Sequence, residues 1–205
     1  MRGELVFDVG DVVVYASHGV GRVAARREQS VVVEFATGGL SVDLPIERAF
    51  ACIRPLSTEA QIVIVGQTLG GADTDAHSNW QHRLKATKAK VTGGNAVELA
   101  EVIRDAARRD ERASARNESR NVSVTERQLY LKARQLLADE IGASRGVDQA
   151  DADEWITEQL AATAEQERSQ ARRVHSPLTH SLTSSGSALT ATVAPSGNRA
   201  RRRKL

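Results

Sequence analysis

The chain has 205 residues, a formal net charge of +2, 40% hydrophobic residues and only 3% aromatic ones, and this length suffices for two small domains or for one domain with tails. No apolar run approaches the roughly 20 residues of a membrane-spanning helix, and the first residues lack the layout of a signal peptide. The single cysteine, Cys52, excludes an internal disulfide, and its apolar neighbours favour a buried thiol. We therefore expect a soluble, cytoplasmic protein.

Charge is distributed unevenly along the chain. Residues 1–55 hold six basic and seven acidic side chains, whereas residues 79–145 hold fourteen basic and nine acidic ones. Residues 172–205 hold seven basic side chains and no acidic one. A nearly neutral front and a basic middle predict two surfaces with different partners.

Residues 5–54 have the pattern of short β-strands. A valine-rich stretch ends at Tyr15, and residues 31–35 and 40–44 are two further strands that the Gly38-Gly39 pair joins by a tight turn. Strands this short, within about fifty residues, favour a small antiparallel barrel of the SH3 or Tudor shape.

The chain after this segment is mainly helical in pattern. The apolar run 58–69 is short enough to be either a helix or a strand. Ser78 and Gln81 have the spacing of a capping box, which predicts a helix over residues 79–91.

Two more helices are expected before residue 145. Asn95 can cap the first, and its apolar residues recur at helical spacing. Residues 112–121 are polar and predict a loop. Ser123 and Glu126 have the spacing of another capping box, and the helix that they open is expected to end at Gly142. The predicted core positions of the two helices are Ala96, Leu99, Ala100, Ile103 and Ala107, then Leu129, Ala133, Leu136, Leu137 and Ile141.

A last helix is predicted over residues 151–170, where Trp155 has the neighbours of an ordinary packing residue. The remaining Ser/Thr-rich residues end in a basic cluster and predict a disordered tail, which either adds nonspecific DNA affinity or is merely solvated. The fold class is therefore α+β with several domains: a small antiparallel barrel in residues 1–56, an all-α domain in residues 57–170 and a disordered basic tail in residues 171–205.

The motifs of catalysis and metal binding are absent from the sequence. It has no glycine-rich phosphate loop with a lysine, no His-Glu metal helix and no paired-cysteine metal site, and its five histidines are scattered. We expect a protein that is not an enzyme and that needs neither a metal nor a cofactor.

The segment from Asn79 to Lys90 is the most informative one. It holds four Lys or Arg, one His and no acidic residue. Such a density of cations suits phosphate binding, although a merely solvated helix face would look the same. Trp80 falls in the first turn of this helix, among polar neighbours. It is either an exposed indole able to wedge against a DNA base step or a staple between two helices.

Several motifs, in this order, resemble the CarD/CdnL family of bacterial transcription regulators over about residues 5–162. They are Phe7–Tyr15 with His18-Gly19, Leu44-Pro45, Asn79-Trp80 with Arg83 and Lys85, residues 100–105, residues 108–110, and residues 132–137.

The resemblance implies two binding surfaces. A Tudor-like N-terminal domain would bind the RNA polymerase β subunit, and Val33, Val42 and Asp43 occupy its polymerase-facing positions. A helical C-terminal domain would hold promoter DNA beside the melted region and stabilise the open complex. The DNA-contacting positions are the Trp80 wedge in the minor groove and four phosphate-contacting residues, His82, Arg83, Lys85 and Arg127. We expect a monomer.

The sequence also departs from the family pattern. His82 stands where the family commonly has Arg, and Asp43 stands where relatives carry a basic residue, which puts polymerase affinity in doubt. The hairpin around residues 28–30 is shorter than usual, and the loop at 112–121 is longer. Two other functions fit the same residues: a nucleoid-type protein that binds nucleic acid without polymerase, and an adaptor that binds only proteins.

Overall fold

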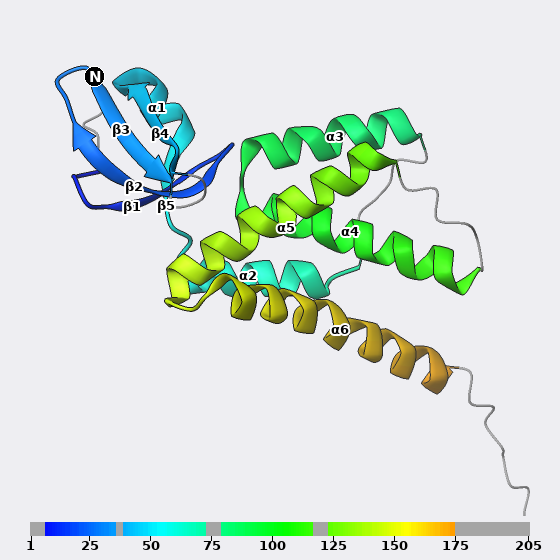
Figure 1. The fold of residues 1–205 in the computed structure, drawn as a ribbon. Coiled ribbons are helices and arrows are strands. Elements are labelled where there is room, and N and C mark those ends of the chain that lie inside the picture. The colour runs from blue at the N-terminus through cyan, green and yellow to red at the C-terminus, as the bar shows by residue number, and fades with distance from the viewer. Residues whose placement is uncertain (1–6, 36–38, 73–78, 117–122, 175–205) are drawn as a thin grey trace, which may run out of the picture.

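The computed structural model describes residues 7–35, 39–72, 79–116 and 123–174. An antiparallel sheet forms one end of the molecule, and a group of packed helices forms the other (Figure 1). This arrangement confirms the predicted α+β class. The predicted boundary at residues 56 and 57 lies in the short connection between the last strand and the first helix of the helical part, and stays a prediction.

The sheet has five strands in the order β4-β3-β2-β1-β5, and all neighbouring strands are antiparallel. The strands are β1 (Val12–Tyr15), β2 (Gly19–Arg26), β3 (Ser30–Phe35), β4 (Ser41–Pro45) and β5 (Ile53–Pro55). The expected barrel is not closed in the part of the chain that the structure describes, because β4 and β5 are opposite edges of the sheet. A helix that the sequence pattern did not predict, α1 (Ile46–Cys52), connects these two edges.

Alternation along the strands builds the core of the sheet. Odd-numbered residues of β3 point inward, and Val31, Val33 and Phe35 are each less than 5% exposed. Cys52 at the end of α1 is only partly buried, whereas a buried thiol was expected. The other buried members of this core are Val13, Val23, Leu44, Ala49 and Ile53.

Five helices follow the sheet: α2 (Glu59–Gly70), α3 (Trp80–Gly93), α4 (Ala96–Ala115), α5 (Val124–Arg145) and α6 (Gln149–Val174). The run at 58–69 is thus a helix. Thr58 caps α2, since its hydroxyl accepts from the Gln61 amide and the Gln61 side chain accepts from the Thr58 amide.

The helices pack around one apolar cluster. It contains most of the predicted core positions of α4 and α5, while Ala107 and Leu129 are only partly buried. Trp155 of α6 packs against the same cluster, which confirms its predicted role, and Arg145 lies 4.5 Å above its ring.

Several predicted helix ends are corrected. Asn79, not Ser78, caps α3, because its side chain accepts from the Gln81 amide; Ser78 itself lies outside the described residues. Ser123 precedes α5 without a capping bond from its side chain. Gly142 lies inside α5, which ends at Gly146, where φ is 70°.

Two predicted nonhelical segments overlap helices of the structure. Residues 112–115 of the predicted 112–121 loop belong to α4, and Arg116 is the C-cap of that helix. Residues 117–122 are not described. The tail predicted from residue 171 begins inside α6, and residues 175–205 lie outside the described part of the chain.

Candidate nucleic-acid interface

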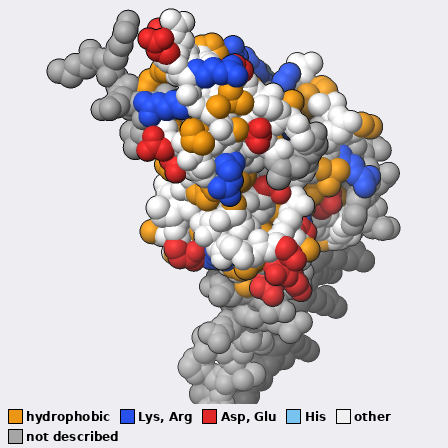
Figure 2. All heavy atoms as spheres, turned by 60° about the vertical axis from the view of Figure 1, so that its left-hand side comes forward, with side chains coloured by type: hydrophobic (Ala, Val, Ile, Leu, Met, Phe, Trp, Pro, Cys, Tyr) orange, Lys and Arg blue, Asp and Glu red, His pale blue; other side chains and the backbone are white. Residues whose placement is uncertain are grey.

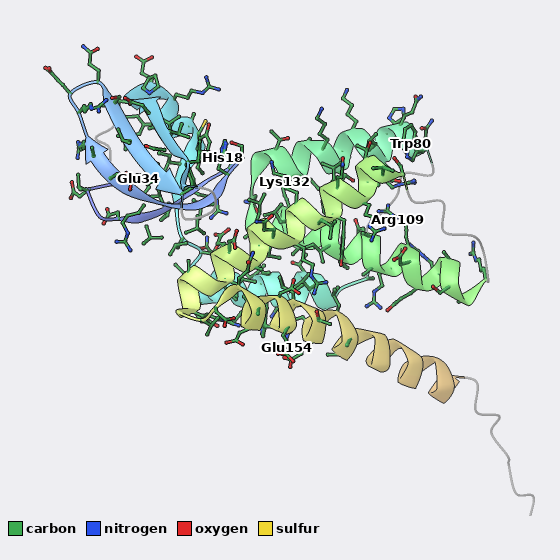
Figure 3. All side chains as sticks on the ribbon, viewed as in Figure 1. His18, Glu34, Trp80, Arg109, Lys132 and Glu154 are labelled. Carbon is green, nitrogen blue, oxygen red and sulfur yellow. The ribbon has the colours of Figure 1, made fainter. Side chains whose placement is uncertain are left out.

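The N-terminal end of α3 holds the residue predicted to wedge into DNA. Trp80 is the first residue of the helix, directly after the Asn79 cap, and 45% of its surface is exposed. Figure 3 places it at the end of α3 that lies farther from the sheet. Trp155 instead packs against the helical core. The first turn of α3 therefore presents a large apolar ring to solvent.

Arg83 has a structural contact that the sequence did not predict. Its Nε lies 3.1 Å from Oε1 of Glu126, and the two side chains are only 20% and 14% exposed. Glu126 was expected to cap its own helix, but it contacts α3 instead. The ion pair holds the first turns of α3 and α5 together, so Arg83 is partly engaged within the protein.

The remaining cations of α3 divide into two groups. Lys85 and Lys88 are exposed, as is His82. Lys90 near the end of the helix forms an ion pair of 2.8 Å with Glu101 of α4. The exposed lysines of α3 thus lie in its second and third turns, and Lys85 is the nearer of the two to Trp80.

The first turn of α5 adds to this end of the molecule. Arg127 is exposed and directly follows Glu126, whose bond to Arg83 brings the two helix starts together. Val124, the first residue of α5, is 73% exposed. Sequence periodicity did not single out Val124, because one valine in a first turn carries no pattern.

We refer to Trp80, His82, Lys85, Val124 and Arg127 as the α3–α5 end. It combines two helix N-termini, whose positive dipole ends attract anions, with exposed basic residues and two exposed apolar side chains. Cations suit phosphates, and a flat apolar ring suits the stacked edge of a base step. Binding of this type would be electrostatic and would read little sequence.

The sheet places the three predicted polymerase-facing residues differently. Val33 is fully buried in the sheet core, so its side chain does not reach the surface, and its polymerase contact stays a prediction. Its neighbour across the ladder, Val42, is partly buried, and Asp43 is exposed. Both lie on β4, an edge strand whose outer side is not paired within the described sheet.

The negative charge of Asp43 has a local partner. Arg27, in the hairpin between β2 and β3, lies 2.6 Å from its carboxylate, and both side chains are about half exposed or more. The pair makes this part of the edge electrically neutral rather than acidic. Figure 2 shows acidic, basic and hydrophobic side chains interspersed over the visible face of the sheet end.

A hollow of about 440 Å³ is lined by residues of the sheet end and of α5. Its wall includes Asp139, and burial raises the pKa of this carboxyl above its ordinary value. Other residues of the wall are His18, Phe35, Leu40, Leu131, Lys132 and Leu136. The His18 ring stacks on Tyr15 with 5.2 Å between ring centres.

Within the described ranges, no cluster of His, Cys, Asp or Glu has the geometry of a metal site. Over the same ranges, no helix is both long enough and apolar enough to cross a membrane.

Comparisons with known proteins match both ends of the molecule. The family model described as CarD-like/TRCF RID domain matches residues 7–57, and the model described as CarD, C-terminal domain, matches residues 64–157. Together they cover more than two thirds of the chain. A Bacillus subtilis (strain 168) protein named "Putative transcription factor YdeB" is 22% identical over 151 residues, which is 69% of this chain and 94% of that relative.

Proposed function

This chain belongs to the CarD family of transcription regulators, and we propose that it binds RNA polymerase through its sheet and promoter DNA through the α3–α5 end. The observation that carries the DNA half is the exposed Trp80 ring at the start of a helix whose exposed charge is positive. The observation that carries the polymerase half is the match of residues 7–57 to a domain of the polymerase-interacting kind.

In this chain, the polymerase contact is assigned to the β4 edge of the sheet. The surface that it meets is assigned to the β subunit of RNA polymerase. An edge strand offers unpaired backbone donors and acceptors to a strand of another protein. Val42 supplies a partly buried apolar contact and Asp43 a charged one, which Arg27 already neutralises. Arg27 thus offsets the negative charge that Asp43 would otherwise present to the partner.

The DNA contact is assigned to the minor groove at the edge of the melted promoter. Trp80 would insert at a base step, while Lys85 and Arg127 would contact phosphates. His82 is exposed beside them and would add a further contact. An inserted ring occupies space that the strands need in order to re-pair, and so slows closure of the open complex.

In this proposal the protein acts in the cytoplasm as a monomer, without catalysis, metal or cofactor. It adds no chemistry to transcription; it changes the lifetime of a complex that polymerase forms. Whether the result is activation or repression then depends on which step limits a given promoter.

Retention of bacterial RNA polymerase by the immobilised full chain tests the proposal, in the absence and presence of promoter DNA. We expect retention in both, with DNA strengthening it. Salt-sensitive binding to any duplex without retention of polymerase would instead indicate a nucleoid-type protein. Retention of polymerase with no effect of DNA at any salt concentration would indicate a protein-only adaptor.

A further inference from the structure

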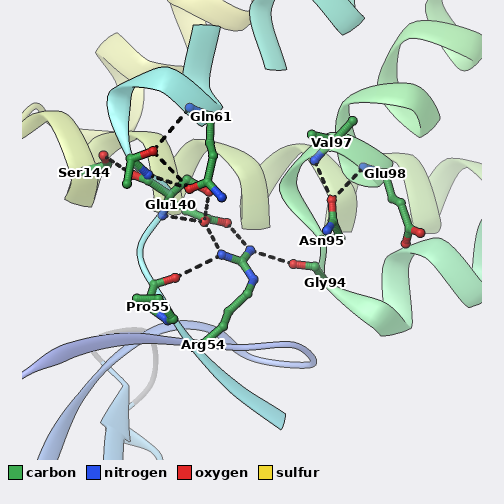
Figure 4. A network of polar contacts seen from close by, with 11 residues as sticks. Arg54, Pro55, Gln61, Gly94, Asn95, Val97, Glu98, Glu140 and Ser144 are labelled. Atoms are coloured by element: carbon green, nitrogen blue, oxygen red, sulfur yellow. Dashed lines mark hydrogen bonds and ion pairs between the residues drawn. The ribbon is translucent and has the colours of Figure 1, made fainter. Parts of the chain in front are cut away.

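The sheet and the helices are joined by one buried carboxylate. Glu140 of α5 is 1% exposed and accepts two bonds from Arg54 of β5, with distances of 2.5 and 2.6 Å to its two oxygens (Figure 4). Oxygen Oε1 also accepts from the Ser57 amide at 3.2 Å and from its hydroxyl at 2.6 Å. A two-pronged arginine–carboxylate pair fixes orientation as well as distance.

The connection between the sheet and the helices is short. Only residues 56–58 lie between β5 and α2, and Ser57 in their middle is buried. The Ser57 carbonyl accepts from the Ser144 hydroxyl at 2.7 Å. The amide and hydroxyl of Ser57 donate to Glu140, so Ser57 has three such bonds. Domains in one chain move relative to each other by default. The short connection and the hydrogen bonds of Ser57 restrict such motion here.

The same arginine also holds the end of α3. The second terminal nitrogen of Arg54 donates to the carbonyl of Gly94 at 2.8 Å. Gly94 is the C-cap of α3, with φ at +65°. A Cβ built on it would lie 2.6 Å from both Cα and O of Ala16, in the turn between β1 and β2. The turn after α3 therefore packs backbone against backbone on the sheet.

Helix α3 is thus held at both ends. Its C-terminal end rests on the sheet through Gly94, and its first turn is tied to α5 through Arg83 and Glu126. Fourteen residues of helix put Trp80 about 20 Å from the sheet contact. Helix α5 carries both Glu126 and Glu140, so a single rigid element connects the two attachments.

We propose that Gly94 and Glu140 are positioning residues that set the place of Trp80 relative to the sheet. The inference rests on the proposed function, in which the sheet is bound to polymerase and Trp80 is inserted into DNA. A wedge is effective only if the polymerase-bound part holds it at the upstream edge of the melted DNA. We call Arg54, Gly94 and Glu140 the joint. The joint fixes the position of α3, and so of Trp80, relative to the sheet.

The chain provides a matched control for Gly94→Ala. Gly146 caps α5 in the same left-handed conformation, with φ at +70°, and a Cβ there would have nothing within 4 Å. Both substitutions strain a left-handed backbone. Only Gly94→Ala also drives a methyl group into the backbone of Ala16, so the difference between the two variants isolates the contact with the sheet.

The first readout is a distance between spin labels in the full chain. Glu34→Cys on β3 and Ala89→Cys on α3 are both at exposed positions, and Cys52→Ala removes the native thiol. We expect a narrow distance distribution in the otherwise native chain and in Gly146→Ala, and a broadened or shifted one in Gly94→Ala. Glu140→Gln, which keeps the shape of the side chain but not its charge, is expected to behave like Gly94→Ala. Equal label-distance distributions for Gly94→Ala and Gly146→Ala would contradict the proposed role of Gly94 in holding α3 against the sheet.

The second readout is the lifetime of the promoter open complex at saturating protein. We expect Gly94→Ala to shorten it severalfold relative to Gly146→Ala while retention of polymerase is unchanged. A changed label distance with an unchanged lifetime would overturn the positioning role. If the native chain itself fails to lengthen the lifetime, the proposed function fails, whereas the label distances still decide whether the joint exists.

Discussion

Nε of Arg83 lies 3.1 Å from Oε1 of Glu126, which ties the first turn of α3 to the first turn of α5. From the sequence, Arg83 was expected to contact DNA and Glu126 to cap its own helix. The pair is mostly buried, so its strength depends little on salt. A residue of the basic motif thus also supports the helix that presents Trp80.

We predict that Arg83 and Glu126 are energetically coupled in folding. In a double-mutant cycle of Arg83→Ala and Glu126→Ala, the free energy of unfolding should show a coupling of about 1–2 kcal/mol, as expected for a partly buried, charge-assisted hydrogen bond. Urea unfolding measures it. Additive losses within error would mean that the contact contributes nothing to stability.

Lys85 is exposed in the second turn of α3, and we predict that it contacts phosphate. Lys85→Glu should weaken duplex binding by at least about 1 kcal/mol and lower the slope of log affinity against log salt by about 1. Arg48→Glu, an equal charge change on α1 of the sheet end, is the control and should leave the slope unchanged. An unchanged slope for Lys85→Glu would show that this lysine does not meet phosphate.

Asp43→Arg should strengthen retention of RNA polymerase, because the family resemblance implies a basic, polymerase-facing residue at this position. Its effect on the free energy of unfolding should stay below about 1 kcal/mol, since the ion pair with Arg27 is exposed. Arg27→Ala is the matched comparison, because it removes the partner but keeps Asp43. Weaker retention with Asp43→Arg would mean that the polymerase surface prefers the acid.

Asp139→Asn should stabilise the protein at neutral pH. Burial raises the pKa of Asp139 above its ordinary value of 3.8, so the folded state holds this proton more tightly than the unfolded state does. The wild type therefore loses stability as the pH rises from about 4 through the folded pKa, and the loss persists at pH 7.

The amide has no charge to desolvate, so its advantage should be below about 1 kcal/mol at pH 7 and shrink toward pH 3. Urea unfolding of the two proteins at each pH measures the difference, because contributions common to both cancel. A variant less stable than the wild type at pH 7 would contradict the assignment.

Local signals were sufficient for much of the fold. The alternating strands, the Asn95 cap and the apolar stripes of α4 and α5 follow from short-range patterns, and the structure confirms them. Helix α1 was missed, because seven residues directly after Pro45 carry too little periodicity. Gly142 was misread as a helix end, since only the backbone conformation distinguishes it from Gly146.

Contacts between distant residues were beyond sequence reasoning. Arg54 and Glu140 are far apart in the chain, and nothing in either segment indicates the bond between them. The same holds for Arg83 with Glu126 and Arg27 with Asp43. The exposure of Trp80 could be suspected from its polar neighbours. The burial of Val33 depends on which face of β3 is turned to the core, and only the structure shows this.

The lifetime of the promoter open complex, measured after addition of a competitor, shows whether Trp80 stabilises that complex. Polymerase alone, with the native chain and with Trp80→Ala should be compared. Trp155→Ala, which removes a packed rather than an exposed ring, shows how much of any effect comes from lost stability, expected here to be about 2–4 kcal/mol. We predict that the native chain lengthens the lifetime and that Trp80→Ala removes most of this gain while remaining folded and bound to polymerase. Equal lifetimes with the native chain and Trp80→Ala would contradict it.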